Sequence, residues 1–497
     1  MGIIEKQTIK GSLFSYLGVG FGFLTVGLLW PRILEPEAIG VVNFLVALSA
    51  ILAHVGSLGI NSVIVRLFPY FRDDEKRHNG FLSLALLIVL AGILVVVAYY
   101  LLFRERIVAN NLEKSRLVAQ YAYFIVPFTV TTLLYNLFDS LHKVSYNAVV
   151  GVVVKEFVFR VLNLLLILAY AWFSFRFQLF MNLYYLIFSF PALLLILLLV
   201  RGGKFDFRLP RGFLTGDLRR SLLDVSLFGL LGGMGTIAIS NIDKIMINRF
   251  IDLEATGIYS IAFLFGTIIT LPSRPLSKIA TTIMAESFKK DDMATIDTIY
   301  RKSCLNQFIF GGLVFLLVWL NIDLVFLVIP GEYEAGRMVI FYMALAGVVE
   351  MATGINGMMI STSPYYRYQS LFIFFLLFLV IVSNWYFIPR LGITGAALAS
   401  LLSTIVYNIV RAVFIYKKFG MQPFTYRFLV VFGLLLISFF AGTFLGGISH
   451  WLVRTLAILG NILTVYLVPL YFLKVSEDIN PFVDRILGRI LGPVKRH

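Results

Sequence analysis

Long apolar runs cover nearly the whole chain, and the short segments between them carry most of the charged residues. A helix crosses a bilayer with about 20 apolar residues. Fourteen runs approach or exceed that length, at residues 12–31, 40–65, 81–103, 117–138, 145–172, 179–200, 221–247, 256–283, 304–328, 338–361, 368–388, 392–416, 428–447 and 453–473. The pattern predicts an all-α polytopic membrane protein with about 14 transmembrane helices.

Composition agrees with this class. The chain has 497 residues, of which 59% are hydrophobic and 14% charged, and its mean hydropathy is +0.90. Soluble proteins are about 45–50% apolar and about 25% charged. The single cysteine, Cys304, excludes an intramolecular disulfide and a paired-cysteine metal site. We therefore expect no metal ion and no bound cofactor.

Lys and Arg are unevenly divided between the two sides that the spans define. With the N-terminus inside, 26 of the 42 Lys and Arg fall on the inner side and 10 on the outer side, four of them in the outer loop 104–116. Basic inner loops predict that both termini are cytoplasmic, in the bacterial cytoplasmic membrane. The net charge of +15 then indicates contacts with anionic lipids. No glycine-rich phosphate loop, RNA-binding motif or zinc-finger spacing accompanies the charge, so we expect no nucleic-acid partner.

A short motif occurs twice at a constant spacing. The segment RILEPEAIGVV at 32–42 aligns with RFIDLEATGIY at 249–259, an offset of 217 that also pairs Phe71 with Phe288 and Asp74 with Asp291. Each copy begins a set of six spans, and an even number of spans preserves direction. We therefore predict two parallel halves related by an axis along the membrane normal, which usually rock around a central site.

The repeat and the charge pattern divide the chain into five parts. We expect a six-helix lobe at 1–200, a basic cytoplasmic linker at 201–220, a second lobe at 221–416, two additional transmembrane helices at 428–473, and a cytoplasmic amphipathic tail at 474–497. Apolar positions of the tail fall on one helical stripe, which is typical of a helix lying on the inner leaflet.

Three segments carry a resemblance to a known family. LEPEAIGVVNF after the first span, NIDKIMINRFIDLEATGIYS across the seventh and IPRLGITGAALAS entering the twelfth resemble those of bacterial polysaccharide-unit flippases of the O-antigen type. This family belongs to the superfamily that includes MATE exporters and the lipid II flippase. The resemblance implies two six-helix lobes around a V-shaped cavity.

The same resemblance implies a function and partners. The expected substrate is an undecaprenyl-diphosphate-linked oligosaccharide, moved from the inner to the outer leaflet by alternating access. The resemblance also implies a proton or sodium gradient as the driving force, and a glycan polymerase and assembly proteins as partners.

Ionisable residues inside a span are costly and indicate function. In the fifth span, Glu156 and Arg160 are one helical turn apart and can pair, while Lys155 has no local partner. Two interpretations are open: a self-neutralised pair that fixes helix packing, or a cationic cavity wall that binds substrate.

Arg274 and Lys278 form the strongest cluster, since they place two like charges on one face of the eighth span. Such a pair is unfavourable in lipid without an anion nearby, and the substrate diphosphate would be one. The alternative is that Lys278 extends to the interface. Pro272 and Pro275 are expected to break this helix.

The seventh span contains Asn241, Asp243 and Lys244. At the offset of 217, Asp243 aligns with Val26 and Lys244 with Gly27, so the first copy of the repeat has no charge at these two positions. Lys244 is predicted to bind substrate and Asn241 to line the cavity. Asp243 is either a coupling site for the driving ion or a salt-bridge partner of the other lobe. Adjacent helical residues point about 100° apart, so Asp243 and Lys244 need not pair.

Four further polar positions complete the prediction. Glu350, in the middle of span 338–361, is the second coupling candidate. His54 and Asn61 are expected on one helical face and can line the cavity, although a hydrogen-bonded packing role for His54 is the alternative. Arg411, near an inner span end, is expected to be a topological anchor.

Two other classes of membrane protein are alternatives to a flippase. A small-molecule exporter of the same superfamily often carries cations, which Lys155, Lys244 and their neighbours would repel. A membrane enzyme that processes glycans normally needs a large extramembrane loop or a DxD motif, and the sequence contains neither. The residues favour transport over catalysis.

Overall fold

The computed structural model describes residues 3–73, 75–112, 115–145, 147–203, 215–481 and 483–485. Within them every regular element is a helix, which confirms the all-α polytopic class. The chain forms two compact units, residues 1–261 and 262–497. The middle of the expected linker and most of the expected amphipathic tail, residues 204–214 and 486–497, lie outside the described residues.

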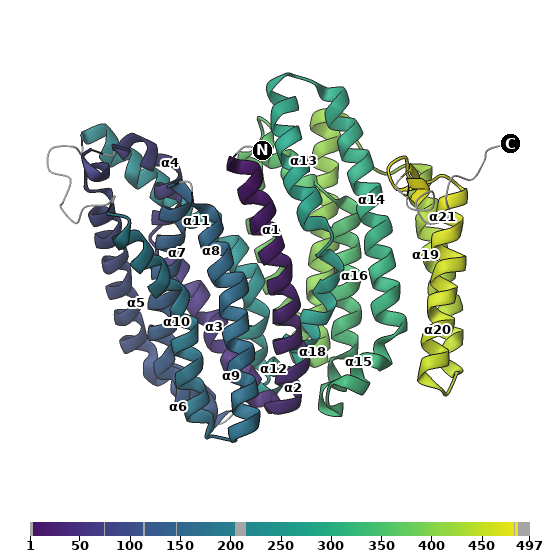
Figure 1. The fold of residues 1–497 in the computed structure, drawn as a ribbon, viewed down its shortest axis with the longest axis horizontal. Helices are drawn as coiled ribbons and strands as arrows, with labels where there is room; N and C mark the ends of the chain where they lie inside the picture. Colours follow the sequence, from purple (N-terminus) through teal and green to yellow (C-terminus); the bar gives the residue numbers. More distant parts are fainter. Residues whose placement is uncertain are drawn as a thin grey trace. The chain divides into compact units, whose positions relative to one another are not determined.

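The N-terminal unit contains most of the first eight expected spans (Figure 1). Its elements are α1 (Ile3–Gly22), η1 (Phe23–Leu29), α2 (Trp30–Ile33), α3 (Pro36–Gly56), α4 (Ile60–Phe71), η2 (Arg77–Gly80), α5 (Phe81–Leu112), α6 (Arg116–Tyr121), η3 (Ala122–Phe124), α7 (Ile125–Val144), α8 (Ala148–Val152), η4 (Val153–Val158), α9 (Phe159–Phe173), α10 (Phe177–Arg201), α11 (Gly216–Phe250) and the first part of α12 (Leu253–Thr267).

The C-terminal unit begins within α12. Its further elements are η5 (Ile268–Thr270), α13 (Ser273–Lys289), α14 (Met293–Leu320), α15 (Ile322–Val328), η6 (Gly331–Gly336), α16 (Arg337–Thr353), α17 (Asn356–Thr362), α18 (Arg367–Phe419), α19 (Tyr426–Phe444), η7 (Leu445–Gly447), α20 (Trp451–Asn461), η8 (Ile462–Leu467) and α21 (Val468–Phe472). Within this unit, α19, α20 and α21 stand beside α14 at one edge (Figure 1).

Twelve of the described helical segments are long and apolar enough to cross a membrane. This number differs from the fourteen expected spans at two places. The expected spans 368–388 and 392–416 form the single helix α18, which kinks at Gly392 with φ of 61°. The expected span 145–172, which folds into α8, η4 and α9, is not among the twelve.

Two expected spans are shorter than their apolar runs, because the chain turns inside them. Leu58 and Gly59 have positive φ and separate α3 from α4, so the expected helix over 40–65 is wrong beyond Gly56. Gly354, with φ of 51°, separates α16 from α17 in the same way. The break expected at Pro272 is present, since α13 begins at Ser273.

Large apolar side chains remain on the surface of both units. Trp172 is 85% exposed, Leu102 77% and Phe444 85%. A soluble protein rarely exposes contiguous apolar surface on this scale, whereas a bilayer would cover it. This surface is therefore the one expected to face lipid.

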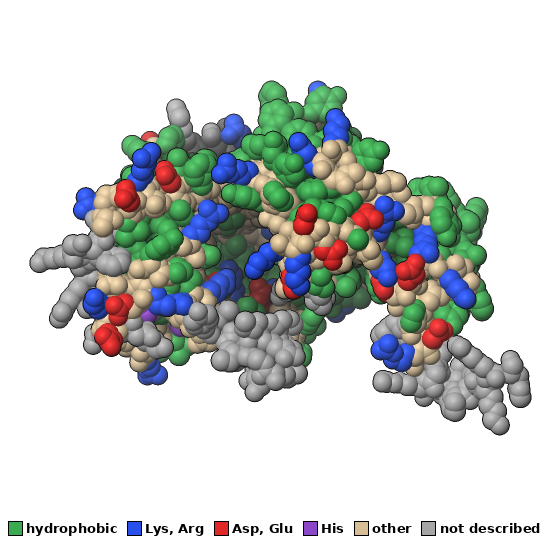
Figure 2. Space-filling view, turned by 90° about the horizontal axis from the view of Figure 1, so that it is seen from above, with side chains coloured by type: hydrophobic (Ala, Val, Ile, Leu, Met, Phe, Trp, Pro, Cys, Tyr) green, Lys and Arg blue, Asp and Glu red, His purple; other side chains and the backbone are tan. Residues whose placement is uncertain are grey.

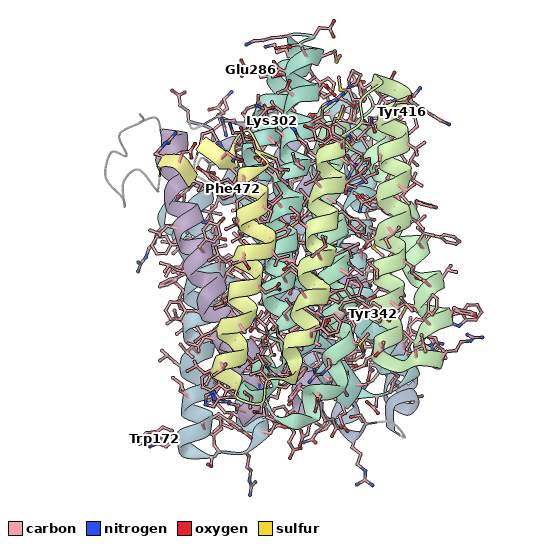
Figure 3. The ribbon with its side chains drawn as sticks, turned by 90° about the vertical axis from the view of Figure 1, so that its right-hand side faces the viewer. Trp172, Glu286, Lys302, Tyr342, Tyr416 and Phe472 are labelled. Atoms are coloured by element: carbon pink, nitrogen blue, oxygen red, sulfur yellow. The ribbon has the colours of Figure 1, made fainter. Side chains whose placement is uncertain are left out.

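Segments assigned to the same side of the membrane meet in the C-terminal unit. Lys302, Arg427 and Glu477 lie together at one end of the unit. Figure 3 labels Lys302 at this end, together with Glu286 and Tyr416. Figure 2 looks onto this end and shows Lys and Arg side chains on it. Arg337 and Arg454 come from segments assigned to the opposite side, and both pair with Asp323, at 2.8 and 2.9 Å.

The two copies of the repeated motif also meet. A Cβ on Gly40 would lie 1.9 Å from the carbonyl oxygen of Leu253, and one on Gly257 would lie 1.9 Å from that of Pro36. Pro36 and Leu253 begin α3 and α12, and they are 217 positions apart, as are the glycines. Such a reciprocal contact is typical of equivalent segments related by a two-fold rotation. The two six-helix lobes remain a prediction.

Candidate functional site

Lys155 lies in η4, a π-helical segment inside the fifth expected span. Segments of this kind are rare and occur frequently at functional sites. The Lys155 ammonium lies 4.2 Å from the centroid of the Tyr135 ring on α7, and the side chain is exposed. Both residues line a hollow of about 40 Å³ with Phe159 and Phe188. The ring is thus a partner for the cation that the sequence did not indicate.

Glu156 and Arg160 form the expected pair, with 2.6 Å between Oε2 and Nη2. Helix α1 packs closely on this pair through two glycines. A Cβ on Gly18 would lie 1.8 Å from the carbonyl oxygen of Glu156, and one on Gly22 would lie 2.8 Å from Nη1 of Arg160. The pair therefore contributes to helix packing, and its side chains remain about one-third exposed.

Asp139 is a buried carboxylate that sequence reasoning missed. The expected fourth span ends at 138, but α7 continues to Val144 and leaves the Asp139 residue only 8% exposed. Its carboxylate pairs with Lys143 at 2.5 Å and lies against Gly151, whose Cβ would be 1.8 Å from Oδ1. The spacing of four between Asp139 and Lys143 was the available signal. Asp139 is also near enough to interact electrostatically with Lys155.

Lys244 on α11 reaches α3. Its Nζ donates to Oδ1 of Asn43 at 3.3 Å, and Asn43 in turn donates from Nδ2 to the carbonyl oxygen of Ile39. A neutral amide satisfies one donor of the ammonium without balancing its charge, and the Asp243 carboxylate acts on that charge electrostatically without a hydrogen bond to it. Asn241, one turn earlier, donates to the carbonyl oxygen of Ile237 at 2.8 Å on its own helix.

Asp243 takes a different hydrogen-bond partner from Lys244, although the two charges are near enough to interact electrostatically. The Asp243 residue is 6% exposed, and its Oδ2 accepts a hydrogen bond of 2.7 Å from the Tyr259 hydroxyl on α12. A buried carboxylate needs partners of this kind, because desolvation penalises its charge. Adjacent residues of α11 thus carry a carboxylate that is bonded to α12 and an ammonium that is bonded to α3.

His54 and Asn61 do not share one helix face, because the turn at Leu58 and Gly59 separates their helices. That expectation is wrong. Nε2 of His54 lies 2.8 Å from the carbonyl oxygen of Leu230. The imidazole also packs on Gly233, where a Cβ would be 2.4 Å from Cε1. His54 is 8% exposed and joins α3 to α11.

In the C-terminal unit, Glu350 belongs to a hydrogen-bonded network of side chains from α16 and α18. Oε1 of Glu350 pairs with Arg411 at 3.4 Å, and Oε2 accepts from Nδ2 of Asn408 at 2.7 Å. Thr353 donates to Oδ1 of Asn408 at 2.9 Å. The Arg411 guanidinium also lies 4.1 Å from the centroid of the Tyr407 ring.

The expectation that Arg411 is a topological anchor is wrong. Its side chain is 4% exposed, whereas that of Glu350 is 44% exposed. A Cβ on Gly357 would lie 2.8 Å from Nη1 of Arg411, so the first turn of α17 packs against the guanidinium. A buried arginine depends on such partners, since an uncompensated buried charge is strongly destabilising.

Glu350→Gln should lower the free energy of unfolding by about 1–3 kcal/mol, because Arg411 loses its carboxylate partner while remaining buried. Thermal unfolding of the purified protein measures this. Glu334→Gln is the control, since it removes a carboxylate from an exposed pair with Arg337 on the preceding turn and should cost less than about 1 kcal/mol. Equal unfolding temperatures for the two variants would contradict the role assigned to the network.

The backbone of α13 contains Arg274 and Lys278, four positions apart. Their side chains lie outside the described part of the structure. The other candidates form separate clusters: Lys155, Glu156 and Arg160 near α7, then Asp243, Lys244, Asn241 and His54 on or against α11, and Glu350 in the C-terminal unit. Among the described residues, no group of three or more His, Cys, Asp or Glu side chains is placed to hold a metal ion.

Twelve membrane-length helical segments with charged and polar clusters inside them define a polytopic membrane protein whose ionisable groups lie within its spans. Residues 6–283 match the family described as polysaccharide biosynthesis protein, and the chain belongs to that family. No curated protein matches the chain in sequence.

Solved structures show how widely the fold is shared. The lipid II flippase MurJ, in an inward closed conformation, superposes with a TM-score of 0.70 at 13% identity and covers 93% of this chain and 97% of its own. An inward-facing multidrug resistance MATE family transporter of the MOP superfamily superposes with a TM-score of 0.62 at 14% identity. The match covers 81% of this chain and 94% of that transporter. A point mutant of the Vibrio cholerae MATE transporter VcmN superposes with a TM-score of 0.51 at 13% identity. The match covers 84% of this chain and 98% of VcmN. The chain therefore shares its fold with these three proteins.

Proposed function

We propose that this protein is a flippase that moves an undecaprenyl-diphosphate-linked oligosaccharide from the inner to the outer leaflet of the bacterial cytoplasmic membrane by alternating access. The family supports a role in polysaccharide biosynthesis. The fold is shared with a protein that flips lipid II. Cationic side chains within the spans would hold the diphosphate or an acidic glycan.

The observation that carries the proposal is Lys244, a cation within a membrane-spanning helix whose hydrogen-bond acceptor is the neutral side chain of Asn43. A charge at this depth is costly unless water or an opposite charge reaches it. Lys155 is a second cation within a span: its side chain is exposed, its nearest partner is the Tyr135 ring, and the carboxylates of Asp139 and Glu156 act on it electrostatically. A water-filled path that admits an anionic substrate satisfies both ammonium groups.

Arg274 and Lys278 extend the same proposal to α13. Two like charges one turn apart suit a diphosphate, whose adjacent phosphates carry the complementary charge. Lys155, Arg160, Lys244, Arg274 and Lys278 are the residues proposed to bind substrate. Asn61, Asn241, His54 and Glu156 are proposed to line the path.

The test is a flipping assay in proteoliposomes with a fluorescent undecaprenyl-diphosphate oligosaccharide. We expect protein-dependent movement of this lipid and none of the corresponding lipid monophosphate at equal concentration, because the second phosphate supplies the added charge. A cationic dye serves as the competing substrate. Export of the dye without movement of the lipid would overturn the proposal and identify a MATE-type exporter.

Asp243 is the first candidate for coupling to a proton or sodium gradient. Asp243→Asn retains an acceptor for the Tyr259 hydroxyl but removes the ionisable charge, so gradient-driven flipping should be lost while the protein still folds. Tyr259→Phe is the control, since it retains the carboxylate. Flipping would be followed in vesicles with imposed proton or sodium gradients.

Glu350 is the second candidate for coupling, because its side chain is 44% exposed although it lies within α16. Glu350→Gln is therefore assayed in the same vesicles. Undiminished gradient dependence in both Asp243→Asn and Glu350→Gln would exclude these carboxylates as the coupling sites.

A further inference from the structure

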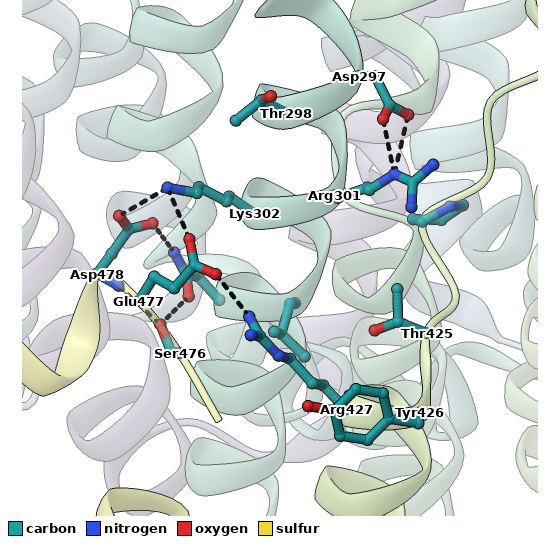
Figure 4. A pocket seen from close by; sticks show the side chains of 13 residues that line it. Asp297, Thr298, Arg301, Lys302, Thr425, Tyr426, Arg427, Ser476, Glu477 and Asp478 are labelled. Carbon is teal, nitrogen blue, oxygen red and sulfur yellow. Dashed lines mark hydrogen bonds and ion pairs between the residues drawn. The ribbon is translucent and has the colours of Figure 1, made fainter. Parts of the chain in front are cut away.

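A polar pocket of about 440 Å³ opens at one end of the C-terminal unit, the end that the charge pattern assigns to the cytoplasm (Figure 4). Three segments far apart in the sequence form it: the first turns of α14, the connection from α18 to α19, and the stretch that follows α21. The pocket is separate from the clusters described above, and nothing in the proposed transport cycle uses it.

Glu477 lies between two cations in this pocket. Its Oε2 is 3.1 Å from Nζ of Lys302, and its Oε1 accepts a hydrogen bond of 3.0 Å from Nη1 of Arg427 (Figure 4). One carboxylate thus bridges an ammonium on α14 and a guanidinium at the start of α19. Two positively charged hydrogen-bond donors thus converge on the oxygens of one anionic group, which is also how proteins bind phosphate.

The segment that carries Glu477 is held in place independently of that carboxylate. Val475 is 3% exposed and belongs to the hydrophobic core of the unit. Ser476 is 4% exposed and donates to Oδ1 of Asn306 at 2.6 Å, while Nδ2 of Asn306 donates to Asp478 at 2.8 Å. Loss of the Glu477 charge therefore leaves the walls of the pocket anchored.

The bridge itself is weak enough to be exchanged. The side chains of Lys302, Arg427 and Glu477 are 42%, 33% and 55% exposed. Exposed ion pairs contribute less than about 1 kcal/mol each, because water and salt screen them. Hydrogen bonds from Arg427 and Lys302 lower the pKa of Glu477, so the carboxylate is ionised at neutral pH and competes with any other anion.

Exposed aromatic side chains flank the pocket. Tyr426 is 71% exposed and lines it, and Phe424 is 45% exposed on the same connection. Aromatic residues are enriched where a membrane protein meets the headgroup layer. An anion at this pocket can therefore come from the membrane surface as well as from solution.

We propose that this pocket binds a phosphate group through Lys302 and Arg427, and that Glu477 is the internal carboxylate that the phosphate displaces. The ligand is a phosphate anion, either the headgroup of an anionic phospholipid or free phosphate. Arg301, which also lines the pocket, is engaged by Asp297 at 2.8 Å, so the site depends on the two cations that Glu477 bridges. The proposal does not depend on which substrate the protein transports.

The test measures thermal unfolding of the full-length protein in detergent, titrated with phosphatidylglycerol, phosphatidylcholine or inorganic phosphate. Glu477→Gln removes the carboxylate that contacts both cations, while Asp478 keeps its weaker contact of 3.9 Å with Nζ of Lys302, so the half-saturating concentration of the anionic ligand should fall about fivefold. Lys302→Gln combined with Arg427→Gln should abolish the stabilisation. Glu286→Gln is the matched control, since it removes a carboxylate from an exposed pair with Lys290 outside the pocket.

Each result has a defined meaning. Stabilisation by phosphatidylglycerol alone, with a lower half-saturating concentration in Glu477→Gln, supports the site and identifies a lipid headgroup. Stabilisation by inorganic phosphate as well supports the site with free phosphate as a sufficient ligand. If Glu477→Gln and Glu286→Gln respond identically to every ligand, the proposal is overturned, even when the double variant fails to accumulate.

Discussion

Replacing Gly40 or Gly257 by alanine should destabilise the protein by about 1–3 kcal/mol and severely reduce its transport activity. The added Cβ would lie 1.9 Å from a backbone carbonyl oxygen in either case. A backbone atom cannot move aside as a flexible side chain does, so α3 and α12 must separate. Thermal unfolding of each variant, together with its flipping rate, measures the effect.

The reciprocal geometry allows a sharper test with the double variant. Both glycines serve the same close approach of two helices, so the Gly40→Ala and Gly257→Ala effects should be clearly less than additive. Gly20→Ala is the control, since no neighbouring atom lies within 4 Å of its Cβ position. Strict additivity, or single variants as stable as Gly20→Ala, would show that the two copies of the motif do not depend on this contact.

Lys244→Gln should reduce flipping of a diphosphate-linked oligosaccharide at least about tenfold at subsaturating substrate. Glutamine preserves a hydrogen-bond donor to Asn43 but removes the charge that we propose attracts the diphosphate. Truncating one partner of a desolvated charge pair typically costs about 2–5 kcal/mol. The flipping rate as a function of substrate concentration is the measurement.

A structural role for Lys244 is separable from a role in binding. Loss of substrate attraction raises the half-saturating substrate concentration, whereas a packing defect lowers the unfolding temperature and leaves that concentration unchanged. Lys290→Gln is the control, because it removes an exposed ammonium, paired with Glu286, outside the spans. If Lys244→Gln transports normally, the anion-binding role must be assigned elsewhere.

The class of the protein and much of its local structure follow from patterns along the sequence. Apolar runs of membrane length predict helices because the bilayer leaves the backbone no other way to satisfy its hydrogen bonds. Local rules also predicted the Glu156–Arg160 pair, one turn apart on one helix, and the helix break at Pro272. Each of these depends only on residues within a few turns of one another.

The meeting points of polar side chains from different helices depend on tertiary packing. Arg411 looked like an anchor at a span end, but Glu350, 61 positions away, is its partner, and Gly357 packs against it. Lys244 meets Asn43 across 201 positions. The turn at Gly59 also depends on a distant helix. A Cβ on Gly59 would lie 1.9 Å from the carbonyl oxygen of Ser226 on α11, and the sequences of α3 and α4 do not predict this contact. Helical periodicity reports which residues share a face, whereas the partner of that face depends on how helices distant in sequence pack together.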